Sequence, residues 1–89
     1  MTVYMVERNL KGIAMGDLAS AQQAAIKTAN AYAAKGTPMR YIRSTFAPED
    51  GRCMCLFEAS NAQDVKMLND EAKLPYSRVV EALDLTPRG

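Results

Sequence analysis

Apolar and polar residues alternate along the chain with two different periods, which predict strands and helices in turn. Residues 2–8, TVYMVER, are rich in β-branched and aromatic side chains at both parities, so we expect a central strand covered on both faces. Residues 39–47 and 52–59 are two strand-like runs joined by Ala-Pro-Glu-Asp-Gly. This pattern predicts a β-hairpin whose turn needs a positive φ at Gly51.

Two segments on either side of the hairpin have the period of a helix. Residues 17–35 are rich in alanine and carry an apolar stripe at a spacing of three to four residues, which predicts a long helix. The spacing Ser60-x-x-Gln63 predicts a capping box at the start of a second helix ending near Lys73. Asn69 and Lys73 share one face of that helix, which we expect to be solvated. Residues 78–85 predict a last strand, followed by a short tail.

The order of these elements predicts an α+β fold, the ferredoxin-like βαββαβ plait, as one domain over residues 1–89. Two helices then cover one face of a four-stranded antiparallel sheet, and we expect the first and third strands to run parallel at its centre. The other face is too apolar to remain in water, with Val3, Met5, Met54, Leu56, Val79 and Leu83. We therefore expect a homodimer, either a face-to-face α+β barrel or a pair joined along a sheet edge.

Side-chain alternation sorts the polar residues of the strands by face. If Cys53, Cys55 and Phe57 face the helices together with Ile42 and Phe46, a polar set faces the opposite way at one end of the sheet. The members of this set are Glu7, Tyr41, Arg43, Glu58 and Glu81. Carboxylates crowded together raise one another's pKa and an arginine lowers it, so the set predicts a small-ligand or cation site. The alternative is that these are solvated strand ends, with Arg43 bridging carboxylates in a dimer.

Composition excludes several classes of function. The chain has no histidine, which removes imidazole acid–base catalysis, Ser-His and Cys-His nucleophile pairs, and imidazole metal sites. A net charge of +1 without a basic run gives no surface for nucleic acid. The longest apolar run is far below the roughly 20 residues of a membrane helix, and the N-terminus does not resemble a signal peptide. We expect a cytoplasmic protein with no nucleic-acid or membrane partner.

The two cysteines, Cys53 and Cys55, are separated by one residue on a predicted strand. They share a face at about 6.5 Å spacing, which is too far for the roughly 4 Å Cβ separation of a disulfide. Alternation on a strand is also a poor chelating geometry compared with a C-x-x-C loop. We expect free thiols packed in the core, with no metal and no cofactor.

Several short segments resemble a known family. They are Val6-Glu7-Arg8, Arg43-Ser44-Thr45-Phe46, residues 51–59 and Val80-Glu81-Ala82-Leu83. The chain resembles, from about residue 3 to residue 87, a bacterial family of small ferredoxin-like domains that includes a nickel-responsive, nickel-binding actinobacterial protein. The resemblance implies the fold and dimerisation. Family members commonly carry histidines where this chain has Asn69 and Lys73, and only Cys55 and Glu58 match typical family positions, so nickel binding does not carry over.

Three hypotheses about function follow. The first is a homodimer that binds a small ligand or cation at the five polar residues. The second is a cofactor-independent isomerase, cyclase or oxygenase that uses a tuned glutamate as acid or base, with Arg43 or Tyr41 stabilising an enolate-like charge. The third is a structural module whose apolar face serves only to pair subunits.

Overall fold

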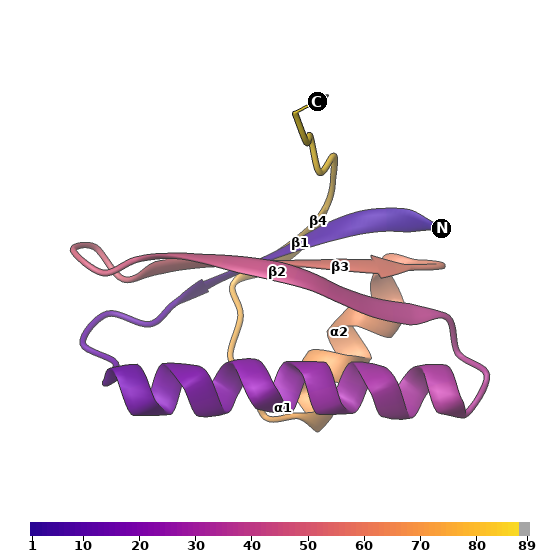
Figure 1. Ribbon diagram of the computed structural model, residues 1–89, viewed down its shortest axis with the longest axis horizontal. Coiled ribbons are helices and arrows are strands. Elements are labelled where there is room, and N and C mark those ends of the chain that lie inside the picture. The colour runs from indigo at the N-terminus through magenta and orange to yellow at the C-terminus, as the bar shows by residue number, and fades with distance from the viewer. Residues whose placement is uncertain (88–89) are drawn as a thin grey trace.

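The computed structural model describes residues 1–87 and has the predicted order of elements. These are β1 (Thr2–Asn9), α1 (Met15–Ala34), β2 (Met39–Ala47), β3 (Arg52–Ala59), α2 (Ala62–Glu71) and β4 (Arg78–Ala82). The strands form one sheet in the order β2-β3-β1-β4, and both helices lie on the same side of it (Figure 1). The ferredoxin-like plait is confirmed. Residues 88 and 89, at the end of the predicted tail, lie outside the described residues.

The central strands of the sheet are β1 and β3, and they are antiparallel neighbours. The expectation that they run parallel is wrong. Each strand–helix–strand connection returns the chain to a strand two places away in the sheet, with one strand between them. Strand β2 is therefore parallel to β1, and β3 fits between them in the opposite direction. This direction decides which polar side chains share an end of the sheet.

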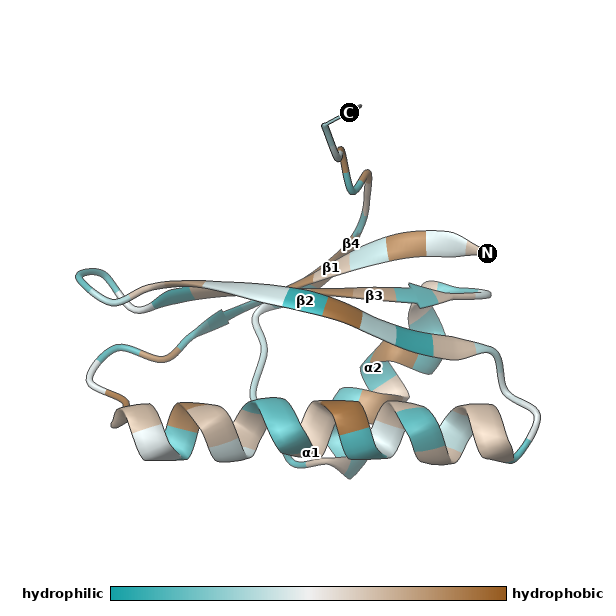
Figure 2. Ribbon diagram, in the orientation of Figure 1, coloured by the Kyte–Doolittle hydropathy of each residue, from teal (hydrophilic) through white to brown (hydrophobic). Residues whose placement is uncertain are grey.

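The core lies between the sheet and the two helices. Val6, Phe57, Val65 and Leu68 are fully buried there, and α1 contributes the small side chains of Ala25 and Ala29. Small residues on α1 let it approach the sheet closely. Figure 2 shows polar and apolar residues mixed along α1 and the strands, as expected for elements buried on one side.

A β-bulge in β2 reverses the predicted faces of two residues. The register of β2 against β3 shifts between Tyr41 and Arg43, so that Tyr41 is paired with Phe57 and turns toward the helices. Ile42 instead lines the other face. Their predicted orientations are therefore wrong, because the bulge adds one residue to the strand. Phe46, beyond the bulge, packs against the core as predicted.

The register of β4 also differs from the prediction. Val79 is paired with Val6 and Glu81 with Tyr4, which places both on the helix side of the sheet. The prediction that both face the opposite way is wrong. The strand is apolar at both parities, so alternation alone does not specify its register.

The N-terminus of α2 has a side-chain cap, whereas no side chain caps α1 at Ala14. Asn61, not Ser60, caps α2, and its side-chain oxygen accepts the backbone N–H of Asp64 at 2.8 Å.

The turn of the hairpin has the predicted backbone conformation, because φ at Gly51 is +78°. Within residues 1–87, no helix combines the length and apolarity needed to cross a membrane.

Candidate functional site

The five polar residues expected to form one site are divided over the sheet. Glu7 is level with Met54 on β3, whereas Glu58 is level with Val3 on β1. The two glutamates are thus roughly 13 Å apart along the strands, at about 3.3 Å per residue. The expected convergence at one end of the sheet is wrong, because it assumed parallel central strands.

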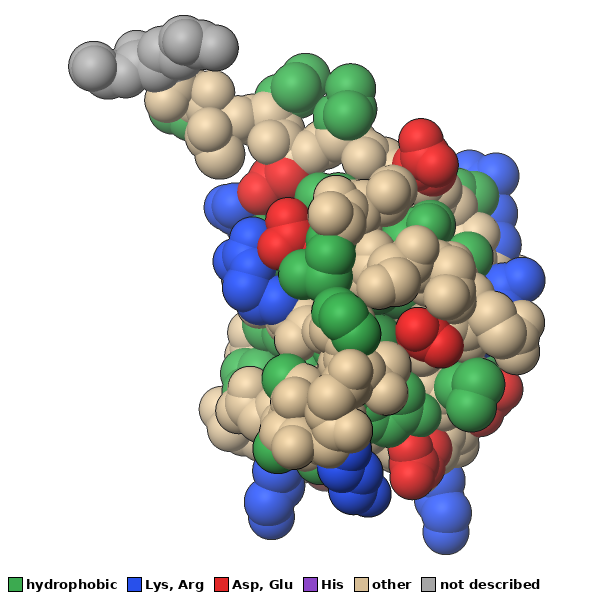
Figure 3. Space-filling model, turned by 90° about the vertical axis from the view of Figure 1, so that its right-hand side faces the viewer, with side chains coloured by type: hydrophobic (Ala, Val, Ile, Leu, Met, Phe, Trp, Pro, Cys, Tyr) green, Lys and Arg blue, Asp and Glu red, His purple; other side chains and the backbone are tan. Residues whose placement is uncertain are grey.

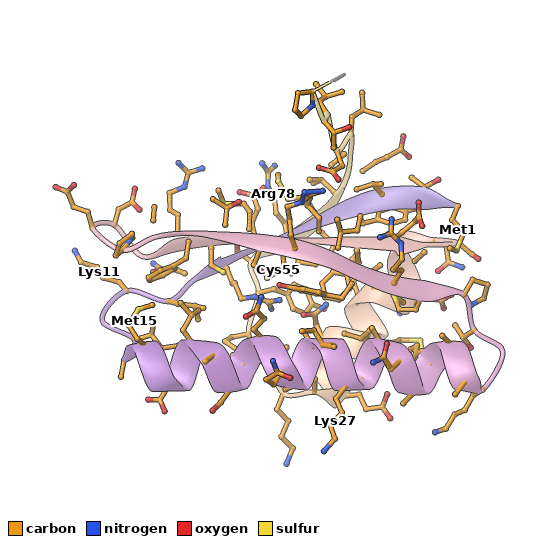
Figure 4. The ribbon with its side chains drawn as sticks, viewed as in Figure 1. Met1, Lys11, Met15, Lys27, Cys55 and Arg78 are labelled. Carbon is orange, nitrogen blue, oxygen red and sulfur yellow. The ribbon has the colours of Figure 1, made fainter. Side chains whose placement is uncertain are left out.

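Ion pairs account for three members of the set on the open face, the sheet face away from the helices. Arg78 donates to Glu7, Arg40 donates to Glu58 with an Nε–Oε1 distance of 3.2 Å, and Arg43 donates to a carboxylate beyond β4 at 2.5 Å. Figure 4 shows Arg78 on this side of the sheet. The three arginine side chains are at least half exposed, so these pairs contribute little to stability.

Tyr41 lies on the helix side of the sheet and belongs to a different hydrogen-bond network. Its hydroxyl accepts from Gln22 Nε2 at 3.0 Å and is 2.5 Å from Ser44 Oγ. Its ring packs edge to face against Phe57 with centroids 5.5 Å apart. The bulge therefore removes Tyr41 from the outward set and turns its hydroxyl toward the layer between sheet and helices.

The open face carries one depression that involves part of the predicted set. A volume of about 640 Å³ is bordered by Glu58 and Glu81, by Arg40, and by the segment after β4. Asp84, the partner of Arg43, also borders it. The structure thus brings Glu58 and, through Asp84, Arg43 to one region of the open face. Glu81 borders the depression from the edge strand β4, although its register places its side chain on the helix side. Glu7 and Tyr41 lie elsewhere.

A second, smaller cavity of about 140 Å³ lies between α1 and the sheet. Sequence reasoning did not identify it. It is lined by Arg8, Leu10, Leu18, Ala21, Gln22, Ala25, Ser44, Phe46, Cys53, Cys55 and Leu74. Most of these side chains are apolar, and Arg8 is the charged one. Figure 4 shows Cys55 on the helix side of the sheet, in the layer that contains this cavity.

Arg8 is a buried cation, with 6% of its surface exposed. Its Nη1 donates to Asn69 Oδ1 at 3.0 Å and to the Pro75 carbonyl at 3.2 Å. Its Nη2 is buried without a hydrogen-bond partner among the described residues. Asn69 is fully buried, so the expectation of a solvated position is wrong. Alternation along β1 places Arg8 on the same side as Val6, and this signal in the sequence could have identified the buried arginine.

The two thiols lie next to this arginine. Cys53 Sγ and Cys55 Sγ are 3.9 Å apart, and Cys55 Sγ accepts from Ser44 Oγ at 2.9 Å. Both are free and buried, as predicted. Burial raises the pKa of Cys53 to about 11, Cys55 adds to the rise, and Arg8 opposes it. The thiol is therefore protonated and neutral near pH 7.

This raised pKa predicts how stability depends on pH. The folded state holds the Cys53 proton more tightly than an unfolded thiol with a pKa of 9.0, so the free energy of unfolding should fall as pH rises from 9.0 toward about 11. Denaturant unfolding across this range should show a shallower fall in Cys53→Ala than in the natural chain. The tyrosines also affect stability at high pH, since burial and Glu71 raise the pKa of Tyr32 to about 12. Both proteins contain the same tyrosines, so the difference between their slopes reports Cys53 alone. Equal slopes in both proteins would refute the assignment.

Comparisons with known proteins support the fold and identify a family. The family model described as "Nickel responsive protein SCO4226-like" matches residues 4–82. The crystal structure of SCO4226 from Streptomyces coelicolor A3(2) superposes with a TM-score of 0.78 at 20% identity, covering 94% of this chain and 99% of that one. At this identity the structural similarity concerns the fold alone. No curated protein matches the chain.

Proposed function

Because the chain belongs to the family of SCO4226-like nickel-responsive proteins, we propose that it acts as a small homodimeric binding module whose two copies pair through their open sheet faces. The observation that carries the proposal is the bare sheet face. Both helices lie on the other side (Figure 1). A chain of 89 residues buries a limited part of its surface on its own, so covering this face adds stability.

The open face has the composition and size of an interface. Val3, Met5, Met54 and Leu56 lie side by side on its two central strands. Four strands of five to nine residues, about 4.8 Å apart and at about 3.3 Å per residue, outline a face of roughly 480 Å² in projection. A standard interface buries about 800 Å² of accessible surface on each partner. The face alone reaches more than half of this value in projection, and the segment beyond β4 adds exposed apolar surface to it.

Most charges around this face are already paired with a charge of opposite sign, which favours a second copy as the partner. Three arginines and three carboxylates form ion pairs there: Arg40 with Glu58, Arg43 with Asp84, and Arg78 with Glu7. A two-fold interface brings the same patch against itself, so a face of one sign would repel its copy. These pairs of opposite sign reduce the repulsion and allow each paired arginine to meet a carboxylate of the other copy.

The segment after β4 adds apolar surface on the same side. It rises from the open side of the sheet (Figure 1), and Leu83 and Leu85 in it are 81% and 85% exposed. Figure 3 shows hydrophobic side chains at this top end of the molecule. Apolar side chains this exposed lose contact with water when a partner covers them, which supports pairing on this side.

Ligand binding at the open face depends on the same pairing. The depression bordered by Glu58 and Glu81 is open on its outer side, so a second copy is needed to enclose a small ligand there. Arg43 contributes through Asp84. Glu7 and Tyr41 lie apart from this depression, and we do not include them in the proposed ligand site.

Nickel does not fit the residues of this chain. The sequence has no histidine, and residues 1–87 contain no group of three His, Cys, Asp or Glu side chains placed to hold a metal. The two neighbouring thiols share their cavity with the guanidinium of Arg8, whose charge opposes a cation. The family is described as nickel-responsive, but we do not assign nickel binding to this chain.

The pairing is tested by replacing one apolar residue at the centre of the open face. Leu56→Lys is expected to convert a dimer into a monomer, because it would bury an unpaired ammonium in the interface. Met67, half exposed on α2, provides the control. Met67→Lys should leave the mass unchanged in light scattering coupled to gel filtration. A natural chain that stays monomeric at every concentration would contradict the proposal.

A further inference from the structure

We propose that the cavity between α1 and the sheet binds a small organic monocarboxylate, with Arg8 pairing its carboxylate. The site lies on the opposite side of the sheet from the open face and does not depend on the pairing of two copies. It is built from Arg8 on β1, the thiols on β3, Ser44 on β2 and an apolar wall from α1.

The positive charge of Arg8 is not balanced by a nearby negative group. A buried guanidinium is costly unless it is paired with a negative group and its donors are satisfied. None of the ion pairs formed within residues 1–87 includes Arg8. Its two acceptors, Asn69 Oδ1 and the Pro75 carbonyl, are neutral and both bind Nη1. The buried Nη2 has no partner there, and Arg8 itself lines the cavity.

The neighbouring Cys53 thiol does not supply the missing negative charge. Cys53 has its pKa raised to about 11, chiefly by burial, and therefore stays protonated near neutral pH. Ser44 Oγ is already within hydrogen-bond distance of Cys55 Sγ and of the Tyr41 hydroxyl. The cavity thus has a cationic donor and neutral polar groups, which suit an anion and disfavour a metal ion.

The size and lining of the cavity narrow the class of anion. Engineered apolar cavities of about 150 Å³ accept benzene, a molecule of six carbon atoms. A cavity of about 140 Å³ is therefore suited to a ligand of similar size. Leu18, Ala21 and Phe46 offer apolar contacts, whereas Arg8 offers a charged fork for a carboxylate. A short-chain monocarboxylate combines both parts, and an inorganic anion lacks the apolar one.

Sodium butanoate is a direct probe of this site. It should raise the midpoint of thermal unfolding by an amount that grows with the logarithm of its concentration above the dissociation constant, because it binds the folded state alone. Sodium chloride at the same ionic strength, neutral butanamide and butylammonium chloride are the matched controls, and each should raise the midpoint much less than butanoate at the same concentration. An equal rise with butanamide would show that charge is not recognised, and an equal rise with chloride would show a general salt effect. Either result overturns the proposal.

Variants separate the role of Arg8 from the stability of the fold. Arg8→Met keeps the length of the side chain without its charge and should weaken butanoate binding by roughly tenfold or more. Ala21→Leu fills the cavity and leaves the guanidinium in place, so it should also block binding even if Arg8→Met fails to fold. Ala19→Leu, on an exposed position of α1, is the control and should bind normally. Unchanged affinity in Ala21→Leu would overturn the proposal.

The same titration on Leu56→Lys distinguishes this site from the dimer. Butanoate binding should persist in that variant, because Leu56 lies on the other face of the sheet from the cavity. Loss of binding together with loss of the dimer would contradict an independent interior site. A natural chain that is monomeric and still binds butanoate would refute the pairing and leave the carboxylate site standing.

Discussion

Gly51→Ala is expected to lower the free energy of unfolding by about 3 kcal/mol, through backbone strain and overpacking. The residue is buried in the hairpin turn with φ at +78°. A Cβ at this position would lie 2.4 Å from both the Cα and the backbone nitrogen of Lys11. The close approach of the turn also holds the loop after β1 in place, because Leu10 donates its N–H to the Gly51 carbonyl at 2.7 Å. Chemical denaturation of the two proteins measures the loss.

Substitutions at two other glycines separate the cost of backbone strain from the cost of the close contact with Lys11. Gly36 has φ at +92° and open space where a Cβ would lie, so Gly36→Ala should cost only the conformational part, about 1 kcal/mol. Gly16 lies in the first turn of α1 without positive φ and without neighbours, and Gly16→Ala should be neutral or slightly stabilising. If Gly51→Ala lowers the free energy of unfolding by no more than Gly36→Ala, the backbone of Lys11 does not lie as close to Gly51 as described.

Asn69→Ala is the second large effect that we expect, with a loss of about 2–3 kcal/mol. The substitution removes the side-chain acceptor of Arg8 Nη1 and leaves a buried guanidinium with the Pro75 carbonyl alone. It also removes the hydrogen bond from Asn69 Nδ2 to the Val65 carbonyl at 2.8 Å. Truncation of a fully buried side chain adds a small cavity to these losses.

A matched substitution tests whether burial is the cause. Asn30 is an exposed asparagine in α1, and Asn30→Ala should change the free energy of unfolding by no more than about 0.5 kcal/mol. Thermal or denaturant unfolding of both variants gives the comparison. Equal changes in the free energy of unfolding at the two positions would indicate that Asn69 is solvated, as the sequence alone suggested.

The parts of the fold that could be predicted from sequence have strong local signals. The hairpin has two apolar runs and a turn with Pro48 and Gly51, and the order of strands and helices follows from the change of period along the chain. The burial of Cys53, Cys55 and Phe57 followed from alternation within β3. Each of these features is specified by neighbours in sequence.

The parts that failed depend on pairing between distant segments. A single extra residue at the bulge leaves no mark in the pattern of β2, so alternation predicts the wrong faces for Tyr41 and Ile42. The direction of β3 relative to β1 then separates Glu7 from Glu58. Arg8 and Asn69 are of residue types usually found at the surface, and they meet across 61 positions of sequence. The interior cavity was therefore beyond local reasoning.

The crystal structure of the protein grown with sodium butanoate tests the central claim most directly, that the buried Arg8 binds an organic anion. The expected electron density places the carboxylate within hydrogen-bond distance of Arg8 Nη2 and the alkyl chain against Leu18 and Ala21. Density for water alone at Nη2, with butanoate absent from the cavity at saturating concentration, would contradict the claim.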